Sequence, residues 1–103
     1  MKQIRQGDVL LEEVDAVPAG AARIPAVGGR LVLAEGEATG HAHTVAEQYG
    51  ELYEKDGTLY LSLTEAVPLE HQEHGAVVLA PRVYRKVQQR EWTDAMEPRP
   101  VLD

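Results

Sequence analysis

The hydrophobic residues of this chain occur in short runs, which glycine and proline separate at close intervals. Short apolar runs bounded by turn-forming residues are typical of β-strands, and no segment shows the sustained hydrophobic repeat of a long helix. We therefore predict strands with short connections along most of the chain. The predicted strands are 8–14, 30–35, 41–47, 52–54, 58–63, 76–80 and 83–92.

The connections between these runs carry turn signals of different strength. An Asp-Gly pair at 56–57 separates 52–54 from 58–63, and such a pair between two strand-like segments predicts a β-hairpin. The segment 15–29 contains several glycines and prolines, so we predict a loop there. The run 76–80 (AVVLA) is apolar at every position, which predicts a central strand buried on both faces.

These elements predict a single all-β domain over residues 1–92. The expected architecture is a small barrel or a two-sheet sandwich of about seven short strands. A chain of 103 residues can bury enough surface to fold without disulfides. Residues 93–103 contain two prolines, and we predict a C-terminal arm or a frayed tail there.

Composition and charge narrow the class of protein. The absence of cysteine excludes a disulfide framework and cysteine-type zinc sites. The formal net charge of −7 argues against a nucleic-acid partner. We interpret the local basic residues as the solvated face of a strand; they are Arg82, Arg85, Lys86 and Arg90. No segment resembles a signal peptide or a membrane span, so we expect a cytoplasmic protein with no membrane partner.

The four histidines form two close pairs and are the distinctive chemistry of the chain. His41 and His43 form an H-x-H pair within a predicted strand. Side chains two residues apart on a strand lie on one face, about 7 Å from each other, so both imidazoles can reach one metal ion. The H-x-H pair is therefore a sound chelating unit.

The second pair, His71 and His74, forms H-x-x-H, and its odd spacing does not fit one face of a strand. These two rings can converge across a helical turn or a tight bend, and the following Gly75 supports a bend. Acidic residues flank both pairs, and each is a candidate fourth ligand, hydrogen-bond acceptor or general base; they are Glu37, Glu47, Glu70 and Glu73. As catalytic residues we single out Glu37 and Glu73.

The histidines could form one of three kinds of metal site, or a cluster without metal. Four histidines would close a tetrahedral zinc shell, which is typical of a structural site. Three protein ligands with a water would make a catalytic site, and histidines with a carboxylate would suit iron or manganese. Zinc is the ion we favour. In the alternative, the histidines form a polar cluster held by hydrogen bonds without metal.

Two resemblances follow from these residues. The order His41-x-His43-x-x-x-Glu47 resembles the first metal motif of cupins, and it implies a cupin-like set of ligands inside a barrel. The chain also resembles a group of small uncharacterised bacterial and phage proteins. The motifs that carry this resemblance are RQGDVL at 5–10, GEATGHAH at 36–43, HQEH at 71–74, 81–87, and QREW at 89–92. The resemblance supports the choice of the histidines and implies no particular reaction.

Two functions remain open at this point. The first is a small metal-binding protein of unknown activity, with His41, His43, His71 and His74 as ligands; whether it is an enzyme stays undecided. The second is a non-catalytic binding or adaptor module with a structural histidine cluster. A homodimer is possible, since the pairs can also meet across an interface. The small-molecule ligand is unknown, as is the role of Gln89, Arg90 and Glu91.

Overall fold

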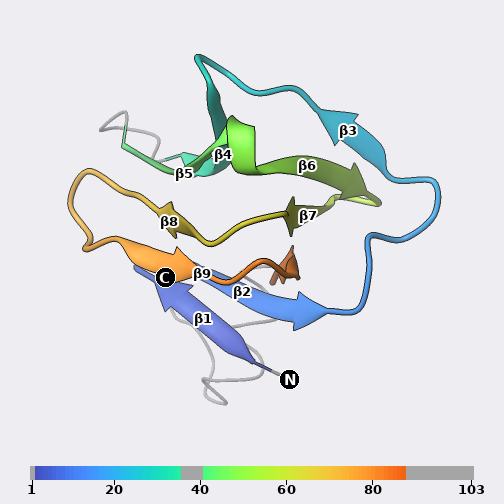
Figure 1. Ribbon diagram of the computed structural model, residues 1–103, viewed down its shortest axis with the longest axis horizontal. Coiled ribbons are helices and arrows are strands. Elements are labelled where there is room, and N and C mark those ends of the chain that lie inside the picture. The colour runs from blue at the N-terminus through green and yellow to red at the C-terminus, as the bar shows by residue number, and fades with distance from the viewer. Residues whose placement is uncertain (1, 36–40, 88–103) are drawn as a thin grey trace, which may run out of the picture.

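The computed structural model describes residues 2–35 and 41–87, and within them the chain is all-β (Figure 1). The largest sheet is antiparallel and has the order β1-β2-β10-β7-β6-β3. Two smaller antiparallel sheets pair β4 with β5 and β8 with β9. The elements are β1 (Gln3–Gln6), β2 (Val9–Val14), β3 (Ala22–Ile24), β4 (Arg30–Glu35), β5 (Ala42–Ala46), the 3-10 turn η1 (Glu47–Tyr49), β6 (Gly50–Lys55), β7 (Thr58–Leu63), β8 (Val67–Leu69), β9 (Val77–Leu79) and β10 (Val83–Lys86).

The predicted sandwich describes this arrangement and the predicted barrel does not. The six-stranded sheet does not close on itself, because β1 and β3 form its two edges. The core contains side chains from the large sheet and from both small sheets, as expected of layers that face each other. The buried residues at its centre are Val9, Leu11, Leu52, Leu61, Leu63 and Tyr84 from the large sheet, with Leu31, Leu33, Val45, Val67, Leu69 and Leu79 from the small ones.

Three strands were absent from the sequence prediction: β8, which Pro68 interrupts in the sequence, and the two edge strands of the large sheet. The short strand β1 has the sequence QIRQ, and β3 has the sequence ARI within the predicted loop 15–29. An edge strand that buries few side chains needs no alternating hydrophobic pattern, so the pattern could not reveal it. The predicted strands 30–35 and 58–63 coincide with β4 and β7, and the Asp-Gly hairpin joins β6 to β7.

The prediction of a central strand at 76–80 is wrong. The strand found there, β9, pairs only with β8 in a two-stranded sheet. Leu79 is buried, whereas the Val78 side chain is 67% exposed, so the two faces of β9 have different environments. An unbroken apolar run therefore gave a false signal of burial on both faces.

The hairpin β4–β5 has a β-bulge on β4 beside His43. Val32 pairs with Thr44 and Ala34 pairs with His43, so Leu33 is an extra residue on β4. Thr44 also forms an isolated antiparallel bridge with Glu70, which joins β5 to the end of β8. The two small sheets are thereby linked, and the H-x-H and H-x-x-H segments lie next to each other.

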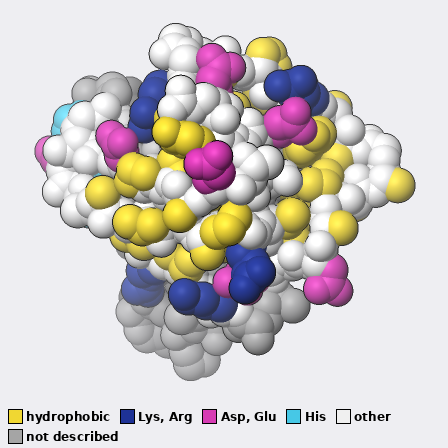
Figure 2. Space-filling model, in the orientation of Figure 1, with side chains coloured by type: hydrophobic (Ala, Val, Ile, Leu, Met, Phe, Trp, Pro, Cys, Tyr) yellow, Lys and Arg dark blue, Asp and Glu magenta, His cyan; other side chains and the backbone are white. Residues whose placement is uncertain are grey.

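The surface in Figure 2 mixes acidic and basic side chains, and on this face histidine shows only at one edge. Within the described residues, no helix is long and apolar enough to cross a membrane. The predicted arm 93–103 and the polar run Gln89, Arg90 and Glu91 lie outside the described residues.

Candidate histidine site

The H-x-H pair is positioned by the alternation of β5. His43 and Val45 are on its buried face, and His43 is only 3% exposed. His41 lies immediately before β5 and is partly exposed.

The H-x-x-H pair lies on a bend rather than a helical turn, with the bend at 72–74. His71 Nδ1 accepts hydrogen bonds from the backbone N–H groups of Glu73 (3.0 Å) and His74 (3.3 Å), which closes the bend. Two contacts dock this segment on β5. Thr44 and Glu70 exchange backbone hydrogen bonds of 2.8 and 2.9 Å, and the Ala42 N–H donates to Gln72 Oε1 at 2.8 Å.

The four imidazole rings lie in one group. The ring centroids of His43 and His71 are 4.3 Å apart, and those of His71 and His74 are 4.5 Å apart. His41 lies edge-on to His71 at 5.6 Å, and His43 is stacked on His74 at 5.9 Å. Residues about thirty positions apart in the sequence thus contribute to one side-chain group.

A buried glutamine, Gln6, connects the two pairs. Its Nε2 donates to the carbonyl oxygens of Leu69 (2.8 Å) and Gly75 (2.9 Å), which flank the H-x-x-H segment. Its Oε1 lies 2.8 Å from His43 Nδ1. Because two carbonyl acceptors fix the NH₂ end of the amide, the oxygen end must accept from His43. His43 therefore carries its proton on Nδ1.

The other nitrogen of His43 faces a carboxylate. With the proton on Nδ1, neutral His43 presents a lone pair at Nε2, and Nε2 lies 3.3 Å from Asp8 Oδ1. Burial lowers the pKa of His43, the neighbouring His71 lowers it further, and Asp8 opposes the shift. In the neutral state two acceptors face each other, and a cation between them would relieve that contact.

The turn between β1 and β2 leaves room for His74. Gly7 has φ +59°, in the left-handed region that favours glycine. A Cβ added at Gly7 would overlap the imidazole ring of His74. The backbone conformation therefore favours glycine here, and an added Cβ would also displace the exposed His74 ring.

An open hollow of about 420 Å³ contains the histidine group. Glu73 also lines it, with Oε2 3.6 Å from His41 Nδ1. Of the residues that the structure describes, those lining this hollow are Gly7, Asp8, Ala34, Glu35, His41, His43, His71, Glu73 and His74.

The other candidate carboxylates have different surroundings. Glu70 pairs with Arg30 (3.6 Å) and lines a separate hollow with Thr44. Glu47 lies in η1, beyond the far end of β5, so the cupin-like spacing does not bring it to the histidines. Glu37 lies outside the described residues.

Within the described residues, no set of three or more histidine, aspartate or glutamate side chains is arranged to hold a metal ion. His71 gives one physical reason. Its Nδ1 accepts backbone hydrogen bonds, so a neutral His71 carries its proton on Nε2 and has no free lone pair there. To act as a ligand, His71 must release these amides or change its protonation.

Sequence reasoning gave no role in the site to Gln6, Asp8 and Glu35. Gln6 is only 3% exposed, but it is a polar residue in a polar edge strand. The pattern of hydrophobic positions therefore does not reveal that it is buried. The one available signal was the segment RQGDVL, in which a glycine and an aspartate follow the glutamine.

Comparison with known proteins gives a family and no activity. No curated protein and no solved structure matches the chain. One family model matches residues 5–89, which span β1 to β10 and include all four histidines. The chain belongs to this family, whose description is Domain of unknown function (DUF8820).

Proposed function

We propose that this protein binds one divalent metal ion, zinc in the first instance, in the hollow between β5 and the bend at 72–74. The observation that carries the proposal is the state of His43. A buried imidazole has its Nδ1–H held by Gln6, while its Nε2 lone pair faces the Asp8 carboxylate at 3.3 Å. Metal-bound histidines commonly donate their second ring N–H to an oxygen acceptor in this way. At present His43 Nε2 and the Asp8 carboxylate, both acceptors, face each other. A metal ion between them would be attracted to both.

The proposed ligands are His41, His43, His71 and His74, with the Asp8 carboxylate within reach of the same position. His43 needs no change of tautomer to bind. His71 must first give up the two backbone hydrogen bonds at its Nδ1. We therefore expect His71 to be the weakest of the four ligands, and Asp8 to be the residue that takes its place. Three histidines with a carboxylate would also suit iron or manganese.

The proposal includes a reaction only if one coordination position holds water. A divalent metal makes a bound water acidic and nucleophilic at neutral pH. Glu73, beside His41 and 69% exposed, could then accept a proton from it. The same role for Glu37 stays a sequence-based hypothesis, as do the cytoplasmic location and the homodimer.

A second function is favoured by a specific observation. Within the described residues, every buried side-chain nitrogen and oxygen has a hydrogen-bond partner. A hydrogen-bonded network of this kind stabilises a fold without metal. The alternative is therefore a non-catalytic binding or adaptor module, in which the histidines hold the H-x-x-H segment on β5.

Metal content and thermal stability separate the two functions. Untagged protein is purified without added metal, analysed for bound metal, and melted with and without one equivalent of zinc. We expect near-stoichiometric metal, or a melting temperature raised by zinc, and loss of both in a His41→Ala, His74→Ala double variant. Protein that holds no metal and melts at the same temperature with zinc contradicts the metal function and leaves the binding module.

Two single variants refine the same experiment. Asp8→Asn keeps the size of a side chain in the hollow and removes its charge, so zinc binding should weaken. Glu47→Gln makes the same change in a carboxylate outside the hollow, and zinc binding should be unaffected. Equal zinc affinities in the two variants would contradict a role for Asp8.

A further inference from the structure

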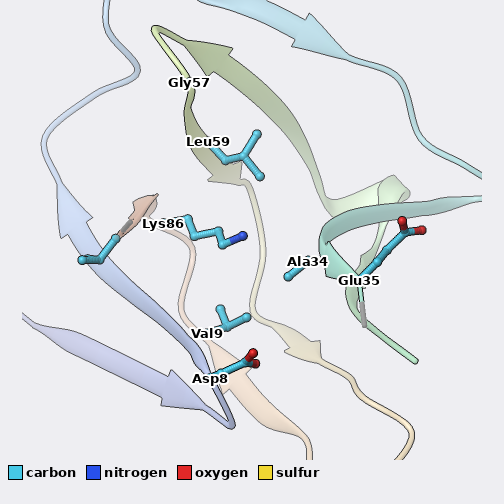
Figure 3. A pocket seen from close by; sticks show the side chains of 8 residues that line it. Asp8, Val9, Ala34, Glu35, Gly57, Leu59 and Lys86 are labelled. Carbon is cyan, nitrogen blue, oxygen red and sulfur yellow. The ribbon is translucent and has the colours of Figure 1, made fainter. Parts of the chain in front are cut away.

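A second hollow, shown in Figure 3, adjoins the histidine hollow and contains a lysine in place of histidines. Its volume is about 360 Å³, within the range of small-molecule sites. Asp8, Ala34 and Glu35 line both hollows, so the two spaces meet along these residues. The described residues that line the second hollow are Asp8, Val9, Ala34, Glu35, Gly57, Leu59, Lys86 and Val87.

Apolar side chains form only part of the walls of this hollow, beside the charged groups of Asp8, Glu35 and Lys86. Val9 and Val87 are almost fully buried, at 1% and 8% exposure, and Leu59 is partly buried. Leu59 on β7 therefore leaves an apolar surface that a short hydrocarbon part of a ligand would contact.

Lys86 brings a positive charge into this hollow. Its side chain extends into the hollow between Leu59 and Ala34 (Figure 3). Its ammonium donates to the carbonyl oxygen of Leu33 at 3.0 Å, which uses one of three N–H groups and fixes its position. Among the described residues, no carboxylate lies within 4.0 Å of this ammonium. A half-buried lysine without a carboxylate partner can bind an anion.

The two acidic residues at the border do not neutralise Lys86. Asp8 is directed to His43, at 3.3 Å from its Nε2. The Glu35 carboxylate points away from Lys86 (Figure 3). If a divalent ion occupies the histidine hollow, the charges of the ion and Lys86 balance the three carboxylates that line the two hollows, Asp8, Glu35 and Glu73.

We propose that the Lys86 hollow binds a small organic acid, with its carboxylate on the Lys86 ammonium and its remainder reaching the histidine hollow. This inference rests on the proposed metal site in one respect, namely that the acid is the ligand or substrate of that site. The pairing of the carboxylate with Lys86 does not depend on the metal site, so it can be measured with or without metal.

Binding of butyrate to the intact protein tests the proposal, in the zinc-free and the zinc-loaded form. We compare wild type with Lys86→Met, Lys86→Arg and Lys55→Met. Met keeps the apolar length and removes the charge, and Arg restores the charge. Lys55 is the matched control, because its ammonium also donates to a backbone carbonyl, that of Ala19, outside the hollow. Circular dichroism melts check that each variant folds.

We expect the Kd for butyrate to rise about tenfold in Lys86→Met and to change little in Lys86→Arg and Lys55→Met. Butyramide, the neutral analogue, should bind weakly to every form. Equal affinity of wild type and Lys86→Met for butyrate, or equal affinity of wild type for butyramide and butyrate, overturns the proposal. Inorganic phosphate is the parallel probe, and tighter binding of phosphate than of butyrate overturns the carboxylate assignment.

Failure of this inference is distinguishable from failure of the metal function. Zinc affinity is measured in wild type and Lys86→Met, and it should be the same in both. Normal zinc binding with no Lys86-dependent binding of butyrate overturns the inference and leaves the metal site. Lys86-dependent binding of butyrate without any zinc binding supports the anion site and contradicts the metal function.

Discussion

His43 and His74 stack on each other in one hollow, yet they are held in opposite ways. His43 is 3% exposed, is fixed by strand pairing, and has both ring nitrogens near a protein oxygen. His74 is exposed, follows a bend, and packs on the turn at Gly7. In the proposed site, His43 would therefore form the rigid side and His74 the adjustable side. A rigid ligand sets the position of an ion, and an adjustable one can close around it.

Gln6 is the residue that makes the two sides depend on each other. It binds the ring of His43 with one end of its amide and the borders of the H-x-x-H segment with the other. A change at Gln6 should therefore alter both sides, whereas a change at His74 should alter only one. The following experiments are arranged to separate these effects.

The largest expected difference is between His43→Ala and His74→Ala. Loss of His43 removes the pre-positioned Nε2, and zinc affinity should fall by more than about 100-fold, beyond the usual effect of losing an outer hydrogen-bond partner. Loss of His74 should cost less, because Asp8 and His71 can compensate. Isothermal titration with zinc measures both. If zinc affinity falls more in His74→Ala than in His43→Ala, His43 is not the residue that sets the position of the ion.

A Gln6→Leu variant tests the link between the sides. It leaves His43 Nδ1 and two carbonyl groups without their partner, so zinc affinity should fall about 10- to 100-fold and the free energy of unfolding by about 1–3 kcal/mol. Gln6→Glu is the control, because it keeps an acceptor for His43 and loses the donors to Leu69 and Gly75. Its zinc affinity should be intermediate. Wild-type affinity in Gln6→Leu would show that the link has no role in binding.

A Gly7→Ala variant tests the packing of His74. We expect a loss of about 1–3 kcal/mol in the free energy of unfolding, from the left-handed backbone and from the overlap with the ring. Gly28→Ala is the matched control, since Gly28 has φ +57° and nothing within 4 Å of an added Cβ. Urea denaturation gives both values. A Gly7→Ala loss no larger than that of Gly28→Ala would show that His74 does not pack on this turn.

The smallest effect concerns the stability of the metal-free protein at acid pH. The folded-state pKa of His43 is lowered from 6.5, so the unfolded chain binds this proton at higher pH than the folded chain does. Stability should therefore decrease as pH falls below about 6.5, until the folded-state pKa is reached. His43→Asn keeps a donor for Gln6 and does not titrate, so its pH slope in urea melts should be smaller. An unchanged slope would contradict the neutral state of buried His43.

Sequence alone predicted much of this molecule where side chains alternate. The strands β4 and β7 and the Asp-Gly hairpin follow from local pattern and turn chemistry. The edge strands β1 and β3 did not, because they bury little. The closed barrel was also wrong, since short strands with alternating pattern do not specify whether a sheet closes.

The partners of the histidines were harder to predict than the histidines themselves. Gln6 at the end of β1 and Asp8 in the turn after it reach His43 from far away in the sequence, so no local spacing connects them. Lys86 was interpreted as part of a solvated basic face, yet it lines a hollow with apolar neighbours. Such contacts depend on tertiary packing, which hydrophobic pattern and motif spacing do not encode.

We propose above all that His43 Nε2 is unprotonated and positioned to bind a metal ion. Long-range ¹H–¹⁵N correlation spectra of ¹⁵N-histidine protein at neutral pH report the protonation of each ring nitrogen directly. We predict that His43 carries its proton on Nδ1, and that one equivalent of zinc shifts its Nε2 resonance while Nδ1 keeps the proton. A proton on Nε2 in the metal-free protein, or an Nε2 resonance unmoved by zinc, would contradict the account.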